Sequence, residues 1–234
     1  MNNRFSINSV LCKIISKLKG ELYSIDPQIP LTYIIRTILN KCLCLFLGMI
    51  RLRTFKLIMI DPSSTIKCSS KISFGKSLNI GPHCYIDALS REGLVFGDNV
   101  SMGYKTHLDL SGSLKHIATS AVIGNNVGLG THGHYGCGVG RLVIGDYTIF
   151  GNYCSVHPET HNFNDLSIPI KYQGVYSKGG VIIGRNCWIG AKVTLLDGTQ
   201  LGDNVIVAAG AVVNGKFPDN SIVGGIPAKI IKIR

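Results

Sequence analysis

The sequence predicts an all-β fold: a parallel β-helix in which short strands and tight turns stack as triangular coils. An aliphatic residue returns at every sixth position in the C-terminal part of the chain, and a small residue usually follows it. The 234 residues include 28 glycines, and only 16% are charged, which is few for the solvent faces of a helical bundle. Neither a helix nor a single strand sustains a period of six.

The repeat is most regular from Ile183 onward. Three six-residue steps make one coil of about eighteen residues, so the aliphatic side chains should point to the axis and stack between coils. The next residue, usually Gly, Ala, Asn or Asp, should permit a tight corner. The aliphatic positions are Ile183, Ile189, Leu195, Leu201, Val207 and Val213, and the positions four residues later are Cys187, Val193, Thr199, Val205 and Ala211.

The same register returns earlier in shorter runs, and it slips between them, which predicts inserted loops. The longest interruption, residues 157–182, contains no repeat but has a varied composition unlike that of a disordered linker. We expect an extruded loop that covers a site. The runs are Phe74, Ile80 and Ile86, then Phe96, Met102 and Leu108, then Ile123 and Leu129, then Ile144, Phe150 and Val156.

Residues 1–60 lack the repeat and contain apolar runs. The stretch Leu31–Ile50 is long enough for a bilayer span, but Arg36 and Lys41 interrupt it. Two interpretations stand side by side: a basic amphipathic segment on the inner membrane face, and a helical cap packed on the solenoid. We expect three parts: a helical N-terminal segment (1–60), the β-helix (61–216) and a basic C-terminal tail (217–234).

The net charge of +11 favours anionic partners, but the basic residues gather at the two ends, so we expect no nucleic-acid face. The eight cysteines form no C-x2-C pair, and several lie within aliphatic strings, which predicts reduced and mostly buried thiols. No secretory signal is visible. We expect a cytoplasmic protein, peripheral at the inner membrane if residues 1–60 contact lipid.

Three segments resemble the coil signatures of hexapeptide-repeat acyltransferases: Val181–Ala191, Ala208–Val213 and Gly224–Lys229. With the loop after Val156, the chain resembles the maltose/galactoside O-acetyltransferase superfamily, and more closely the bacterial polysaccharide and lipopolysaccharide O-acetyltransferases. The resemblance covers about residues 66–234. It implies a left-handed solenoid, an exception to the usual right-handed crossover. It also implies acetyl-CoA as co-substrate, a sugar or polysaccharide acceptor from capsule or O-antigen, and a homotrimer with sites between subunits.

The resemblance places the family's catalytic histidine at His161. A neutral imidazole suits removal of a proton from a sugar hydroxyl, and Glu159 is expected to orient an imidazole through its other nitrogen. His157 is either a supplement to the base or a structural residue. Thr131 stands where galactoside-type enzymes have Asn, so acceptor positioning must differ. The expected acceptor contacts are Thr131, His132, His134 and His157, with Trp188 near the thiol. The alternatives are an ordinary polar turn for the run that begins at Thr131 and a core or interface position for Trp188.

For CoA, the resemblance implies a position along the C-terminal coils, where small residues let the pantetheine arm approach. Asn214 and Gly215 replace the family's usual Thr-Lys, so Lys216 is expected to supply the missing cation. Lys229 and Lys232 match family cations beside the CoA phosphates, and a solvated basic tail is the alternative. The expected CoA contacts are Ala191, Ala209, Asn214, Lys216, Lys229 and Lys232.

Three other functions remain open. A nucleotide-sugar N-acetyltransferase would use the same scaffold. A zinc-dependent γ-type carbonic anhydrase needs three protein ligands; His157 and His161 offer two, and no three-histidine spacing of that family is evident, so we expect no metal. A non-catalytic scaffold would bind no CoA.

Overall fold

The computed structural model describes residues 9–13, 15–17 and 22–234. A helical segment was predicted for residues 1–60, and residues 1–8, 14 and 18–21 of that segment lie outside the described residues. The chain divides into two compact units, residues 1–43 and 44–234. Residues 9–13 and 15–17 are helical. Helix α2 (Leu31–Arg51) coincides with the predicted apolar stretch. By length and composition it could cross a membrane, and 17% of its most apolar window is buried.

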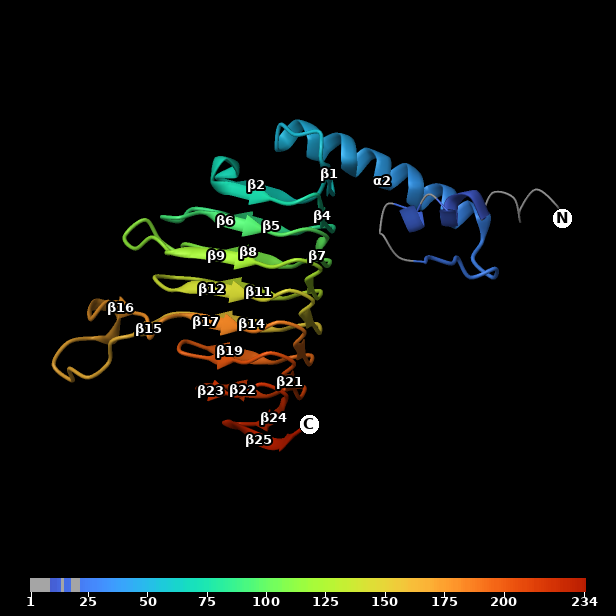
Figure 1. Ribbon diagram of the computed structural model, residues 1–234. Coiled ribbons are helices and arrows are strands. Elements are labelled where there is room, and N and C mark those ends of the chain that lie inside the picture. The colour runs from blue at the N-terminus through green and yellow to red at the C-terminus, as the bar shows by residue number, and fades with distance from the viewer. Residues whose placement is uncertain (1–8, 14, 18–21) are drawn as a thin grey trace. The chain divides into compact units, whose positions relative to one another are not determined.

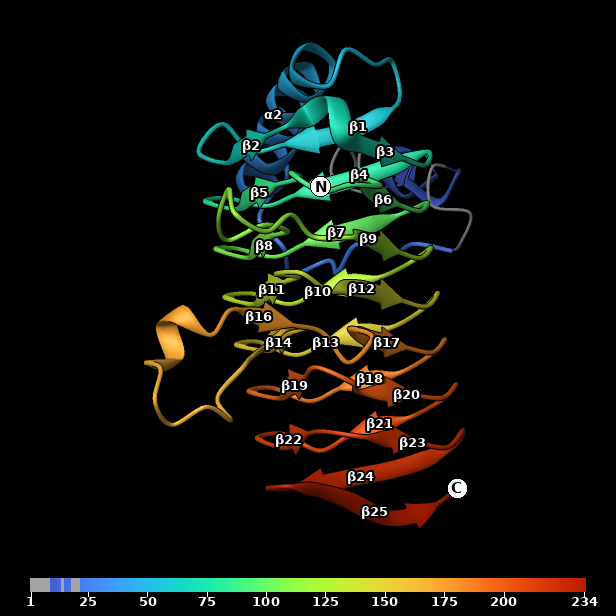
Figure 2. The same ribbon diagram turned by 90° about the vertical axis from the view of Figure 1, so that its left-hand side faces the viewer.

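The second unit is the predicted β-helix: the chain visits three parallel sheets in turn, and the rungs stack from β1 to β25 (Figures 1 and 2). Sheet A contains β1 (Leu57–Ile60), β4 (Ser77–Ile80), β7 (Val100–Met102), β10 (Gly128–Leu129), β13 (Ile149–Phe150), β18 (Trp188–Ile189), β21 (Ile206–Val207), β24 (Ser221–Gly225) and β25 (Ala228–Ile233). Sheet B contains β2 (Thr65–Lys67), β5 (Tyr85–Asp87), β8 (His107–Asp109), β11 (His134–Gly136), β14 (Ser155–His157), β19 (Thr194–Leu196) and β22 (Val212–Val213). Sheet C contains β3 (Ile72–Phe74), β6 (Leu94–Phe96), β9 (Ser120–Ile123), β12 (Arg141–Ile144), β17 (Val181–Ile183), β20 (Gln200–Leu201) and β23 (Lys216–Phe217).

The predicted boundaries at residues 60 and 216 are wrong at both ends. Strand β1 pairs in parallel with β4, and its Ile58 and Ile60 are fully buried, so the apolar run before residue 61 belongs to the first rung. At the other end, β24 continues sheet A and β25 turns back antiparallel to it. The predicted basic tail is therefore largely a strand, which pairs with the last edge of sheet A.

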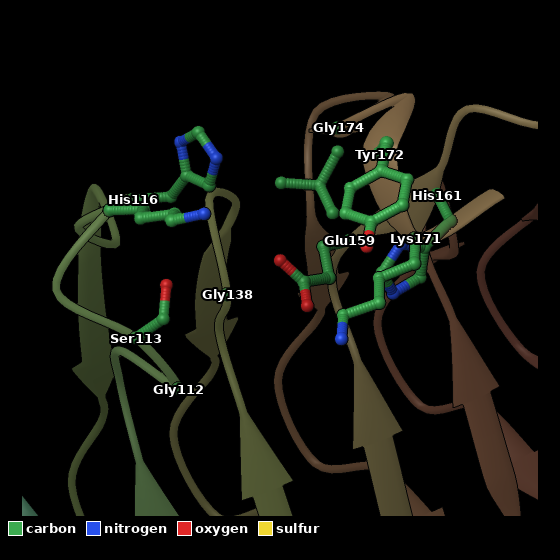
Figure 3. Close-up of a pocket in the computed structure, with 11 residues that line it drawn as sticks. Gly112, Ser113, His116, Gly138, Glu159, His161, Lys171, Tyr172 and Gly174 are labelled. Carbon is green, nitrogen blue, oxygen red and sulfur yellow. The ribbon is translucent and has the colours of Figure 1, made fainter. Parts of the chain in front are cut away.

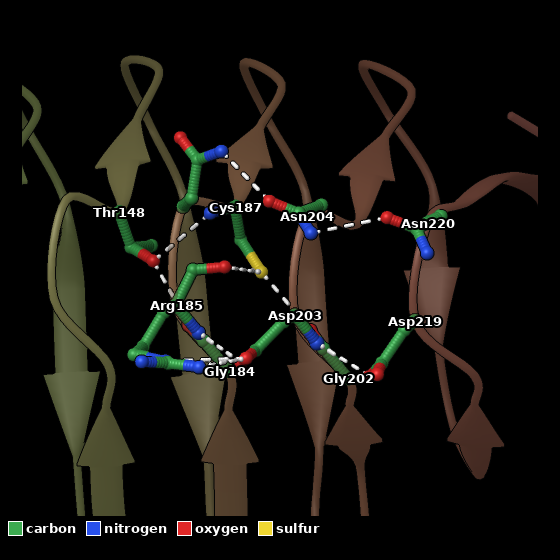
Figure 4. A network of polar contacts seen from close by, with 10 residues as sticks. Thr148, Gly184, Arg185, Cys187, Gly202, Asp203, Asn204, Asp219 and Asn220 are labelled. Atoms are coloured by element: carbon green, nitrogen blue, oxygen red, sulfur yellow. Dashed lines mark hydrogen bonds and ion pairs between the residues drawn. The ribbon is translucent and has the colours of Figure 1, made fainter.

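The repeat residues form the core as predicted. All six aliphatic positions from Ile183 to Val213 are buried, and so are the five positions four residues later. Polar side chains at the latter positions are satisfied by the neighbouring rung. The Cys187 thiol donates to the carbonyl of Gly202 at 3.2 Å (Figure 4). Most described cysteines are buried, as expected: Cys44, Cys84, Cys137, Cys154 and Cys187.

The corner where the chain passes from sheet C to sheet A, the C–A corner, is held by carboxylates. The Asp203 carboxylate accepts a hydrogen bond from the Arg185 amide at 2.7 Å, and the Asp219 carboxylate does the same for the Asp203 amide at 2.8 Å (Figure 4). Beside them, the Asn204 side-chain amide donates to Asn220 at 3.0 Å. Asn204 has φ of 59°, a left-handed conformation that Asn tolerates.

Glycine at this corner is required for a different reason from the one expected. A Cβ on Gly184 would lie 2.4 Å from the carbonyl oxygen of Gly202, and one on Gly202 would lie 2.2 Å from an Asp219 carboxylate oxygen. The left-handed backbone conformation that was expected at the glycines occurs instead at the asparagines two residues later. The glycines instead allow close stacking of successive rungs.

The slips of register all occur at the corner between sheets B and C, the B–C corner. The longest inserted segment leaves the coil after β14 and returns at β17, as predicted, and Figure 2 shows it extending from the coil. It forms the antiparallel hairpin of β15 (Thr160–His161) and β16 (Val175–Tyr176) and the 3-10 turn η2 (Ile170–Tyr172). A second long loop connects β8 to β9, and the shorter turn η1 (Ser69–Lys71) follows β2.

Candidate active site

The two long insertions at the B–C corner enclose a pocket of about 420 Å³ (Figure 3). This volume lies within the usual range for small-molecule sites. The pocket is lined by Gly112, Ser113, Lys115 and His116 from the loop between β8 and β9, by Gly138 after β11, and by Glu159, His161, Lys171, Tyr172, Gly174 and Val175 from the extruded segment.

His161 lies on β15, where it pairs with Val175 of β16, and its side chain is exposed at the pocket. Within the part of the chain that the structure describes, no group hydrogen-bonds its imidazole. The ring nitrogens are therefore open to a ligand in the pocket. The geometry suits proton transfer at a bound hydroxyl.

Glu159 lies between the two insertions in Figure 3. Its carboxylate accepts a hydrogen bond from the Val139 amide at 3.1 Å. Gly138 makes room for it, because a Cβ there would lie 2.0 Å from the carboxylate, and Gly138 has φ of 56°. Among the described residues, Glu159 has no hydrogen bond to His161. The structure thus shows Glu159 at the pocket wall, while its predicted role towards an imidazole stays a prediction.

Asp197, which sequence reasoning missed, anchors the hairpin that carries His161. The carboxylate is only 3% exposed and accepts hydrogen bonds from both ends of the extruded segment. Its donors are the Thr160 hydroxyl at 3.2 Å, the Ser177 hydroxyl at 2.9 Å, the Lys178 amide at 2.6 Å and the Gly180 amide at 3.0 Å. Asp197 stands two positions after the inward Leu195, where the alternation directs a side chain inward again, and this was the available signal, because a buried carboxylate needs partners.

His134 and His157 lie outside the pocket, on the outer face of sheet B. The ring of His134 lies 5.3 Å from that of His107 and 5.8 Å from that of His157. Burial, followed by repulsion from these two rings, lowers the pKa of His134. His157 is hydrogen-bonded to the hydroxyl of Ser155. The described residues include no group of three or more His, Cys, Asp or Glu side chains that could hold a metal ion.

The remaining predicted residues are spread over the solenoid. Thr131 and His132 lie at the A–B corner, the turn from sheet A to sheet B, and His132 stacks on Tyr153 with 4.8 Å between ring centroids. Ala191 and Ala209 lie exposed at this same corner, two and three rungs further along. Sheet B therefore separates Thr131, His132, Ala191 and Ala209 from His161.

The other predicted CoA residues, and Trp188, which was expected near the thiol, lie elsewhere on the solenoid. Asn214 and Lys216 are exposed at the B–C corner, two rungs beyond β14. Trp188, 55% exposed, lies on the outer face of sheet A, and Lys229 and Lys232 are exposed on β25. One chain by itself does not bring the predicted CoA contacts together with His161.

Comparison with known proteins agrees with this fold. A family model described as bacterial transferase hexapeptide (six repeats) matches residues 180–215. The "Putative lipopolysaccharide biosynthesis O-acetyl transferase WbbJ" of Escherichia coli K12 is 30% identical over 167 residues, which cover 71% of this chain and 74% of that protein. The "Probable acetyltransferase Rv3034c" of Mycobacterium tuberculosis is 41% identical over 93 residues, and the match covers 40% of this chain and only 31% of that relative.

Among solved structures, AntD, an N-acyltransferase from Bacillus cereus in complex with dTDP and 3-hydroxybutyryl-CoA, has a TM-score of 0.53 at 20% identity. The match covers 76% of this chain and 80% of AntD, and it shows a shared fold. From the repeat, the three parallel sheets and the extended match to WbbJ, we conclude that this chain is a left-handed β-helix protein that belongs to the hexapeptide-repeat acyltransferase family.

Proposed function

We propose that this protein transfers an acetyl group from acetyl-CoA to a sugar hydroxyl, with His161 as the general base. The observation that carries the proposal is the imidazole of His161, which lines a ligand-sized pocket and has no competing hydrogen bond among the described residues. The similarity to WbbJ, whose name refers to lipopolysaccharide biosynthesis, supports a bacterial surface polysaccharide (capsule or O-antigen) or its precursor as acceptor.

The proposed chemistry needs one proton carrier. A hydroxyl is a poor nucleophile until its proton is removed. A ring nitrogen of His161 takes this proton as the hydroxyl oxygen attacks the thioester carbonyl carbon. The C–S bond then breaks, and the imidazolium returns the proton to the departing thiolate. The products are the acetyl ester and free CoA. The negative charge on the tetrahedral carbonyl oxygen requires a nearby hydrogen-bond donor.

We further propose that the donor is held between subunits of a homotrimer. Ala191 and Ala209, the residues expected beside the pantetheine arm, lie across sheet B from His161 of the same chain. A neighbouring copy that presents its A–B corner would bring donor and base together. Lys229 and Lys232, exposed on β25, remain the proposed partners of the CoA phosphates.

For localisation, we propose a cytoplasmic protein that contacts the inner membrane through α2. The support is the length and apolar composition of this helix and the large exposed side chains along it, among them Ile35, Leu39, Leu43 and Phe46. Sedimentation with anionic lipid vesicles tests this. We expect the whole chain to bind and a variant with Leu39, Leu43 and Phe46 all changed to Ser to remain in solution.

The experiment that tests the activity is His161→Ala in purified protein, with candidate glycans and their amino-sugar analogues as acceptors. We expect turnover to fall by at least ~10²-fold while CoA binding, measured by calorimetry, is retained. His83→Gln, a histidine at the A–B corner, serves as control. Near-normal turnover in His161→Ala would exclude His161 as the base, and transfer to amines alone would favour N-acetylation.

A further inference from the structure

We infer that the acceptor carries a phosphate ester, as a glycosyl phosphate or diphosphate does, and that Lys115, His116 and Lys171 bind this anionic group. The inference rests on the proposed function, because it concerns the acceptor of the same site. Two separate insertions bring these three side chains to one pocket.

The three side chains come from both walls of the pocket. Lys115 and His116 belong to the loop between β8 and β9, and Lys171 belongs to the extruded segment two coils later. In the described part of the chain, neither lysine forms an ion pair with a carboxylate. Lys171 lies over the ring of Tyr172, with 5.9 Å from Nζ to the ring centroid. Lysine binds phosphate as a point charge.

The acidic residue of the pocket does not neutralise these cations. The Glu159 carboxylate is hydrogen-bonded to the Val139 amide, and among the described residues it forms no ion pair with either lysine. Two ammonium groups therefore face a pocket with one carboxylate. A neutral sugar ring would gain little from this charge, whereas a phosphate would gain charge-assisted hydrogen bonds.

The rim of the pocket leaves room for a tetrahedral anion. A Cβ placed on Gly112 would contact nothing within 4 Å, and one on Gly174, with φ of 80°, would have its nearest neighbour at 3.9 Å. Backbone without side chains lets an anion approach its amide groups. Ser113, which precedes Lys115 and His116 in the same loop, adds a hydroxyl donor.

The order of the rungs indicates that Lys115, His116 and Lys171 contact the acceptor rather than the donor. The loop carrying Lys115 follows β8, two rungs before β14, from which the His161 hairpin emerges. The proposed donor contacts begin at Ala191, in the rung after β14, and end on β25. Acceptor and donor would thus approach His161 from opposite ends of the solenoid.

The first experiment measures binding of inorganic pyrophosphate and of UDP to the full chain by calorimetry. In the double variant Lys115→Gln/Lys171→Gln we expect affinity for both probes to fall at least about tenfold. Lys105→Gln, an exposed lysine in the same coil as Lys115 but at the A–B corner, should bind the probes as the unchanged protein does. CoA affinity should be the same in all variants. Unchanged pyrophosphate affinity in the double variant, or a loss of CoA affinity instead, would overturn the inference.

The second experiment compares a neutral acceptor with three that carry phosphate: methyl glycosides against the matching glycosyl 1-phosphates, UDP-sugars and polyprenyl-diphosphate sugars in detergent. We expect a higher kcat/KM for the phosphorylated member of each pair, and this advantage should vanish in the double variant and shrink with salt. The phosphorylated acceptor with the highest kcat/KM of the three identifies the source of the phosphate. Equal kcat/KM for neutral and phosphorylated acceptors, in the unchanged protein and in the double variant, would refute the anion site but would leave the proposed acetyl transfer standing. Retained pyrophosphate binding without any acetyl transfer would refute the proposed activity alone.

Discussion

The Thr160 hydroxyl donates a hydrogen bond of 3.2 Å to the carboxylate of Asp197, and so connects the strand of His161 to the next rung of the coil. The same carboxylate accepts the Lys178 and Gly180 amides at the other end of the extruded segment. One buried acid therefore holds both ends of the insertion. The position of the proposed base depends on it, although Asp197 does not line the pocket.

We expect Asp197→Ala to lower kcat by about 10–10²-fold, because a small misplacement of a reacting group is costly. CoA affinity should be retained, since the proposed donor contacts lie elsewhere. The amides left buried and unpaired should also lower the free energy of unfolding by about 1–3 kcal/mol. Steady-state kinetics and urea unfolding check both effects, and Asp197→Asn, which keeps one acceptor oxygen, should fall between. Unchanged kcat in Asp197→Ala would show that the hairpin is held by other contacts.

For Glu159, the hydrogen bond to Val139 predicts a difference between two substitutions. Glu159→Gln keeps an acceptor for the Val139 amide and should retain most activity. Glu159→Ala loses it and should raise the acceptor KM severalfold, and Gly138→Ala should do the same because its methyl group would displace the carboxylate. Initial rates over a range of pH provide the test. A large fall in kcat with a shifted pH profile in Glu159→Gln would instead support the orientation of an imidazole by its charge.

The C–A corner makes stability depend on pH. The Arg185 amide and guanidinium hold the pKa of Asp203 below its usual range. A lowered folded-state pKa stabilises the fold above the unfolded-state value of about 3.9, and this contribution is lost as the pH falls through the folded-state pKa. We expect Asp203→Ala to cost about 0.5–1.5 kcal/mol near pH 7 and progressively less below about pH 4. Urea unfolding at several pH values checks this, with the exposed Glu92→Ala as control. A cost that stays constant to pH 2 would contradict the prediction.

The interior should be sensitive to a single deletion of volume. Leu195 is fully buried, so Leu195→Ala should lower the free energy of unfolding by about 2–5 kcal/mol. Leu166, 97% exposed on the extruded segment, is the matched control, and Leu166→Ala should change it by less than about 0.5 kcal/mol. Equal effects of the two substitutions in urea titrations would argue against the assigned register.

Thiol reactivity should follow burial. Burial raises the pKa of Cys137 to about 12 and also raises the pKa values of Cys84, Cys154 and Cys187. Because the thiolate is the reactive form, a thiol reagent at pH 8 should label the exposed Cys42 and Cys68 first. The four buried thiols should react only after denaturation. Peptide mapping by mass spectrometry identifies the labelled sites, and rapid modification of Cys137 in the folded protein would contradict the assignment.

Much of the fold was predictable because each six-residue step forms one short strand and one turn, so that residues close together in the sequence reveal the repeat. Each aliphatic residue that the register directs inward, such as Ile189 or Leu195, is buried. The interruption before Ile183 marks the extruded segment in the same way. The first strand was missed because β1 precedes the regular part of the repeat, and the pairing of Ile58 and Ile60 with β4 is what identifies it as a rung. Strand β25 was missed because its pairing with β24 is antiparallel and falls outside the period.

The spacing of neighbouring residues was enough to predict which residues face the axis, where the coil is interrupted, and which histidine stands on the interruption. No local pattern predicts that the loop of Lys115 meets the hairpin of His161, that Asp197 anchors this hairpin, or that Ala191 lies across sheet B from it. These relationships arise because stacking of the coils brings together residues separated by one or more whole turns, and the lengths of the insertions at the B–C corner set which of them meet.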